Sequence, residues 1–163
     1  MKEPSATFSA GFGAPFLPRH PGEYARMLVE RLELHDVPVW LVNTGWTGGP
    51  YGVGHRMDIE HTRNIVRAAI GGQLDRATYE DDPIFRVAVP TSVPGVPDEL
   101  LQPRATWVDP DAYDATARRL AAMFAANFAE YADGVSEGVR GAGPIEVSSS
   151  NVGEIPRSSP GEG

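Results

Sequence analysis

The chain has 163 residues, a net charge of −8 and no cysteine, and Lys2 is the sole lysine among its 14 basic residues. This length fits one domain of roughly 100–200 residues, and the lack of cysteine excludes disulfide scaffolds, thiolate metal sites and cysteine nucleophiles. With only a terminal lysine, the chain cannot carry a Schiff-base enzyme or a Walker-type phosphate loop. The acidic balance disfavours nucleic-acid binding. Because no apolar run approaches the ~18 residues of a membrane span, we expect a cytoplasmic protein without a membrane partner.

The first elements along the chain are an irregular stretch, a helix and a strand. Residues 4–18 interleave aromatic residues with glycine and proline, which predicts irregular backbone with an apolar side. Pro21 opens a helix whose apolar residues follow the 3.6-residue period. The run Val-Pro-Val-Trp-Leu-Val at 37–42 predicts a short buried strand, in which a proline near the start is tolerated.

A glycine-rich segment and a capped helix follow this strand. Residues 43–57 (NTGWTGGPYGVGHRM) predict a long loop. Asp58 is placed to cap the next helix, which the Gly71-Gly72 pair ends. A second short strand is predicted over 84–89, and the segment 80–82 (EDD) before it is interpreted as a solvated turn.

The last predicted element is the longest helix. The prolines between positions 90 and 103 predict an extended loop, after which Asp109 caps and Pro110 opens a helix that reaches Tyr131. Residues 145–163 are rich in Ser, Gly and Pro and predict a flexible tail after a domain at 1–144. Strands and helices alternate, which indicates an α/β or α+β fold. Two strands form only a marginal sheet, so the chain is expected to be part of something larger.

The glycine-rich segment 43–57 is the most informative candidate for a site. It links an apolar strand to a helix start, where α/β folds bind nucleotides and where free N–H groups favour an anion. It lacks the spacing of both common nucleotide fingerprints, so a surface loop with turn glycines stays a full alternative. His55, Arg56, Asp58, Glu60 and His61 lie nearby without a metal-binding spacing, and the serines have no nucleophile-elbow context. No catalytic or metal-ligating residue is therefore assigned.

Several motifs in collinear order resemble the C-terminal part of ATP-dependent phosphoenolpyruvate carboxykinases. The resemblance covers roughly residues 4–144 and is carried by FSAGFGAPF at 8–16, LVNTGW at 41–46, the segment 56–63, AVPT at 88–91 and LQPR at 101–104. It implies the C-terminal part of a mononucleotide-binding domain. The implied reaction is the conversion of oxaloacetate and ATP to phosphoenolpyruvate, ADP and carbon dioxide in gluconeogenesis, with Mg²⁺ on the nucleotide and Mn²⁺ at the substrate.

The resemblance also implies which residues hold the nucleotide. The matching positions are Arg56, Met57 and Thr62, and an arginine suits this role because it stacks on a base or meets phosphate. The family's phosphate loop and its metal ligands lie upstream of the matching region, so this chain is expected to supply only the nucleotide-side loop. We therefore expect an inactive C-terminal fragment, with the N-terminal part of the same enzyme as a partner.

Two other interpretations stay open from the sequence. One is a non-catalytic nucleotide-binding or interaction module, and the other is an inactive gene remnant. A fragment is also expected to expose apolar side chains that lost their partners, namely Phe8, Phe12, Phe16, Trp40 and Leu41.

Overall fold

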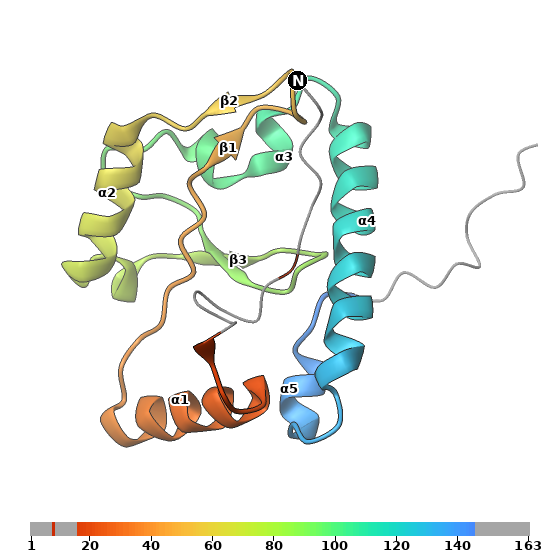
Figure 1. Cartoon of the computed structure of the whole chain (residues 1–163). Coiled ribbons are helices and arrows are strands. Elements are labelled where there is room, and N and C mark those ends of the chain that lie inside the picture. Colours follow the sequence, from red (N-terminus) through yellow and green to blue (C-terminus); the bar gives the residue numbers. More distant parts are fainter. Residues whose placement is uncertain (1–7, 9–15, 146–163) are drawn as a thin grey trace, which may run out of the picture.

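The computed structural model describes residue 8 and residues 16–145 (Figure 1). The predicted tail at 145–163 lies outside these residues except for Ile145, as does most of the irregular stretch at 4–18. The α-helices are α1 (Pro21–His35), α2 (Ile59–Ile70), α3 (Pro103–Thr106), α4 (Pro110–Phe128) and α5 (Glu137–Gly141). The strands are β1 (Trp46–Thr47), β2 (His55–Arg56), β3 (Tyr79–Asp81) and β4 (Ala88–Pro90), and short 3-10 turns lie at Leu74–Arg76, Asp98–Leu101 and Ala129–Tyr131.

The three long helices begin where the sequence places their caps. The Asp58 carboxylate accepts the Glu60 backbone N–H at 3.0 Å and so caps α2. Asp109 does the same for α4, where it accepts two backbone N–H groups ahead of Pro110 at the first helical position. α1 begins at Pro21 behind an unusual cap, the His20 ring, which accepts the Gly22 N–H at 3.1 Å.

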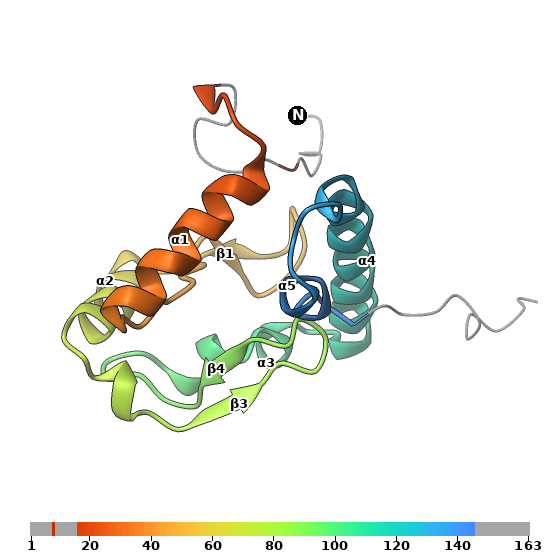
Figure 2. The same ribbon diagram turned by 90° about the horizontal axis from the view of Figure 1, so that it is seen from below.

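The strands form two separate antiparallel hairpins. β1 pairs with β2, placing Trp46 opposite Arg56, and β3 pairs with β4, placing Glu80 opposite Val89. Figure 2 shows α1 and the β3–β4 hairpin on opposite sides of the molecule, with α4 along one edge. The structure therefore combines helices with small sheets, which confirms the mixed helix-and-strand class.

Three details of the sequence prediction are wrong. Residues 37–42 are extended but belong to no strand of the described part of the chain. The strand predicted over 84–89 is shifted to Ala88–Pro90, because Asp82 accepts the backbone N–H groups of Ile84 and Phe85 and holds those residues in a turn. Glu80 lies in β3 rather than in a turn.

A small core lies beside α2. It consists of Ala68, Leu74, Val93 and Val96, against which Trp40, Ile65, Ala69, Leu100 and Leu101 pack. α4 buries Ala117 and Ala121, whereas α1 buries none of its residues. The expected exposure of Leu41 and Phe16 is confirmed, since each is 88% exposed, and Phe8 is 36% exposed. Trp40 is instead half-buried, and Phe12 lies outside the described residues.

None of the helices in the described part of the chain is both long and apolar enough to span a bilayer.

Candidate functional site

The glycine-rich segment is a β-hairpin rather than an unstructured loop. We call β1, β2 and residues 48–54 between them the Gly-rich hairpin, which lies beside α3 in Figure 1. Its turn is closed by the backbone N–H groups of Val53 and Gly54, both of which donate to the Pro50 carbonyl. Gly48 and Gly52 have φ angles of 78° and 86°, a left-handed conformation that favours glycine. The predicted loop at 43–57 is therefore corrected to a defined turn between two short strands.

Gly54 is required for close packing inside this hairpin. A Cβ atom at position 54 would lie 2.5 Å from the Gly49 carbonyl oxygen, 2.6 Å from the Thr47 carbonyl oxygen and 2.6 Å from Trp46 Nε1. Only a residue without a side chain lets the two arms approach this closely. The hairpin therefore needs glycine at positions 48 and 52 because of their positive φ angles, and at position 54 because a side chain there would clash.

Thr106 at the end of α3 fixes the position of the hairpin. Its hydroxyl accepts the Thr47 hydroxyl at 3.3 Å and the Gly48 backbone N–H at 3.2 Å, and it donates to the Pro103 carbonyl at 2.8 Å. One donor and two acceptors are all that a hydroxyl offers, so every hydrogen-bonding position of Thr106 is used. Sequence reasoning missed this residue because it lies 59 positions from Thr47 and carries no local motif.

Arg56 and Met57 lie where the hairpin leads into α2. Arg56 is in β2 and exposed, and it forms no ion pair with another described residue. The Met57 N–H donates to the Gly45 carbonyl at 3.2 Å, and its side chain is half-buried. The end of the hairpin therefore carries an exposed guanidinium without an ion pair, followed in sequence by a half-buried methionine.

Thr62 follows in the first turn of α2. Its hydroxyl donates to the Asp58 carbonyl at 3.4 Å, which leaves the lone pairs of the Thr62 oxygen free to accept another donor. The same turn carries the carboxylates of Asp58 and Glu60, and Asp58 already accepts the Glu60 N–H. Like charge therefore weakens this helix start as a phosphate site. The arrangement suits an uncharged, hydrogen-bonding ring better than an anion.

α2 is itself held against the rest of the chain. Asn64 Nδ2 donates to the Gly95 carbonyl at 2.9 Å, and the His61 ring lies 3.4 Å from the same oxygen. Gly95 has a φ angle of 75°, so the turn that offers this carbonyl favours glycine. Asn64 and Gly95 thus fix the helix that carries Thr62, and sequence reasoning named neither as a site residue.

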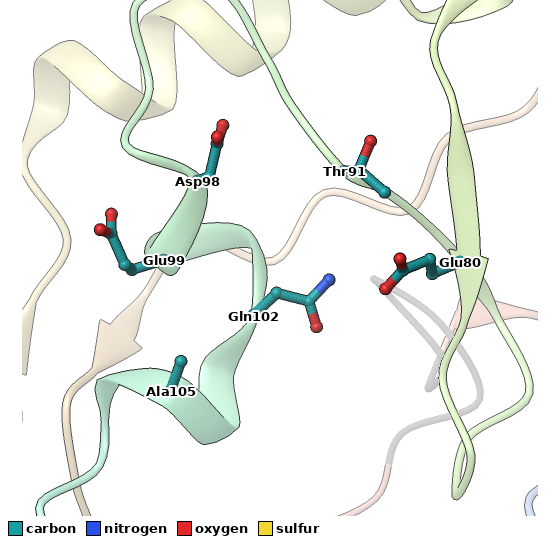
Figure 3. Close-up of a pocket in the computed structure, with 6 residues that line it drawn as sticks. All are labelled: Glu80, Thr91, Asp98, Glu99, Gln102 and Ala105. Carbon is teal, nitrogen blue, oxygen red and sulfur yellow. The ribbon is translucent and has the colours of Figure 1, made fainter.

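A hollow elsewhere in the structure is chemically unsuited to a nucleotide. This hollow has a volume of about 340 Å³, and in Figure 3 Gln102 and Glu80 point toward one another from opposite sides of it. Its remaining lining residues are Thr91, Asp98, Glu99 and Ala105. Three carboxylates and no basic side chain line it, so phosphate is disfavoured there. Arg56, Met57 and Thr62 do not line it.

The three residues predicted to hold the nucleotide thus come from β2, the residue after it and the first turn of α2. Within the described ranges, His, Asp and Glu side chains form no group of three that could hold a metal ion. The three predicted residues thus lie close together along the chain at the β2–α2 junction, and the described residues assign no ligand for a cation.

Comparison with known proteins identifies the family. A sequence model described as phosphoenolpyruvate carboxykinase matches residues 1–99. A phosphoenolpyruvate carboxykinase (ATP) of Thermus thermophilus is 58% identical over 144 residues, which are 88% of this chain and 27% of that protein. Homologues of the same name from Caldanaerobacter subterraneus and Moorella thermoacetica are 55% and 56% identical, over 88% and 89% of this chain.

This chain is much shorter than the relatives that it matches. The chain spans about a quarter of the length of the curated relatives that it matches, 27% in each of these three cases. The family sequence model covers well over half of the chain, residues 1–99, which include the Gly-rich hairpin and α2. On this basis the chain belongs to the phosphoenolpyruvate carboxykinase family.

Proposed function

We propose that this chain supplies the nucleotide-side wall of an ATP-dependent phosphoenolpyruvate carboxykinase. In this proposal Arg56, Met57 and Thr62 contact the adenosine end of ATP. The whole enzyme would convert oxaloacetate and ATP to phosphoenolpyruvate, ADP and carbon dioxide, as a cytoplasmic step of gluconeogenesis. The observation that carries the proposal is the presence of an unpaired guanidinium, an apolar side chain and a free hydroxyl acceptor at one hairpin–helix junction of a carboxykinase-family chain.

Each of the three side chains has a chemical role that fits a purine ring. The planar guanidinium of Arg56 can stack on the base or donate to it. Met57 offers a polarisable apolar surface, and such thioethers pack well against aromatic rings. The Thr62 oxygen can accept a hydrogen bond from an exocyclic amino group, because its own proton is directed to the Asp58 carbonyl.

The phosphates and the metal ions require groups that we do not assign to this chain. Mg²⁺ and Mn²⁺ supply positive charge for phosphoryl transfer when they are bound. The described residues offer no triad of His, Asp or Glu for such an ion, and the α2 start carries Asp58 and Glu60. This chain would therefore orient ATP, while the remaining part of a carboxykinase supplies the phosphate loop and the metal ligands.

The nucleotide contact can be tested in a hybrid enzyme. The 144 matched residues of the Thermus thermophilus relative would be replaced by the corresponding residues of this chain, and the KM for ATP would be measured. Removal of a charged contact costs ~1.5–3 kcal/mol, so Arg56→Ala is expected to raise the KM for ATP about 10- to 150-fold with kcat little changed.

Arg67→Ala is the matched control, because Arg67 is also exposed but lies in the last turn of α2. It should leave the KM for ATP unchanged. Equal effects of the two substitutions, or no effect of Arg56→Ala, would contradict the assigned contact. The 163-residue chain alone, assayed with ATP, Mg²⁺, Mn²⁺ and oxaloacetate, should show no turnover. Clear turnover would contradict the proposal that the phosphate loop and the metal ligands come from the remaining part of a carboxykinase.

A further inference from the structure

The segment that joins α1 to the Gly-rich hairpin has the sequence of an interior strand but none of the contacts of one. Residues 37–42 (VPVWLV) form a nearly continuous apolar run, which is typical of strands that are buried on both faces of a parallel sheet. In Figure 1 this segment runs as an extended trace between α1 and β1. Among the described residues, no backbone hydrogen bond joins 37–42 to any other part of the chain.

The two faces of this segment differ at Trp40, although Val42 on the Trp40 face is itself 46% exposed. Trp40 points to the core beside α2 and stacks on Tyr79, with ring centroids 5.9 Å apart and planes 16° apart. On the opposite face, at alternate positions, Val37, Val39 and Leu41 are 49%, 58% and 88% exposed. Side chains at alternate positions of an extended segment share a face. One face of the segment is therefore partly covered by this chain, and the other is an uncovered apolar row.

The strands of the described part of this chain do not pair with residues 37–42. β1 pairs with β2 and β3 with β4, in two separate sheets, and neither hairpin reaches residues 37–42. An extended apolar segment with unpaired N–H and C=O groups is a template for another strand. The chain spans only 27% of the carboxykinase that it matches, so the remaining three quarters of such a protein are the natural source of a covering layer.

We propose that residues 37–42 are an interior strand that pairs with strands of the remaining part of a phosphoenolpyruvate carboxykinase, whose apolar layer covers Val37, Val39 and Leu41. The partner is thus a carboxykinase polypeptide, whether it is joined to this chain or separate from it. The inference depends on exposure, backbone pairing and the length of the relatives. It does not depend on nucleotide contacts by Arg56, Met57 or Thr62, so either proposal can fail alone.

Amide hydrogen exchange tests the pairing residue by residue. In the isolated 163-residue chain the amides of residues 39–42 should exchange at nearly the rates of a free peptide. In the hybrid enzyme described above, ladder hydrogen bonds should slow several of them at least about 100-fold. Fast exchange in the hybrid enzyme, or slow exchange already in the monomeric chain, would overturn the proposal.

A second test uses binding in trans. The polypeptide that makes up the remaining part of the Thermus thermophilus relative would be titrated with this chain, and binding would be followed by calorimetry. Leu41→Asp should weaken the complex at least about 10-fold, because it buries a charge in an apolar layer. Val108→Asp is the matched control, since Val108 is 94% exposed but lies between α3 and α4.

Neither substitution removes a packed side chain, so both variants should unfold at the temperature of the unchanged chain. Equal affinities of the two variants, or no complex with the unchanged chain, would contradict the proposed surface. A homodimer of this chain that Leu41→Asp dissociates would also overturn it, because residues 37–42 would then pair with a second copy.

Discussion

The hydroxyl of Thr106 should determine how firmly the Gly-rich hairpin is held. Thr106→Val keeps the size and branching of the side chain but removes all three hydrogen bonds of the hydroxyl. The Gly48 N–H and the hydroxyl of Thr47, which is only 9% exposed, then lose their partner. Leaving such groups unpaired costs about 1–3 kcal/mol in total. A chain of this size loses about 2–4 °C of Tm for each kcal/mol.

Thermal unfolding of the 163-residue chain measures this effect directly. Thr106→Ser retains the hydroxyl and should recover most of the lost stability. Thr91→Val is a matched control, because the Thr91 hydroxyl makes one bond, to the Thr78 carbonyl at 3.2 Å, outside the hairpin. Thr91→Val should therefore cost less, about 0.5–1 kcal/mol. If Thr106→Val and Thr106→Ser melt at the same temperature as the unchanged chain, the hydroxyl does not anchor the hairpin.

Three further predictions concern single residues. Gly54→Ala should destabilise the chain by about 1–3 kcal/mol because its Cβ would clash with backbone oxygens, whereas Gly45→Ala, with nothing within 4 Å, should be neutral or slightly stabilising in the same melting assay. Asp58→Ala should cost about 1 kcal/mol by removing the cap of α2, and an unchanged Tm would refute that role. The Arg104 guanidinium, 2.8 Å from Asp114, lowers the pKa of that carboxyl below its ordinary value of 3.8. The stability advantage of the unchanged chain over Asp114→Asn should therefore be complete at neutral pH and disappear as the pH falls below about 3.8, and an advantage that persists in acid would contradict the pairing.

The helices were predictable from sequence because their ends are local. Asp58 and Asp109 cap α2 and α4 through N–H groups two or three residues away, and Pro110 fixes the backbone at the first helical position of α4. Such signals need no information from distant parts of the chain. The positions of Arg56, Met57 and Thr62 at one hairpin–helix junction follow from the same local order.

The strands were harder to predict because pairing depends on distant residues. The apolar run at 37–42 predicts a buried strand, yet no described part of this chain lies beside it to accept its hydrogen bonds. β3 contains Glu80 and Asp81, whose charges favour a turn by composition, and its strand conformation comes from pairing with Val89 and Ala88. The composition of a short segment does not reveal whether a distant strand pairs with it.

The contacts that hold the hairpin and α2 in place could not be predicted from the sequence either. Thr106 meets the hairpin across 59 positions, and Asn64 meets the Gly95 carbonyl across 31 positions. Neither pair belongs to a motif with a characteristic spacing. The sequence therefore suggested Arg56, Met57 and Thr62 as candidate nucleotide contacts, which stays a prediction, but it did not reveal the residues that hold the hairpin and α2 in place.

The central claim is that ATP lies at the junction of β2 and α2, and photolabelling tests it most directly. The hybrid enzyme would be irradiated with an ATP analogue that carries an azide on its adenine ring, and the labelled peptides would be sequenced. The label is expected on the peptide that contains residues 56–62, and excess ATP should suppress it. A suppressible label confined to another part of the enzyme, such as the acidic hollow at Glu80 and Gln102, would contradict the account.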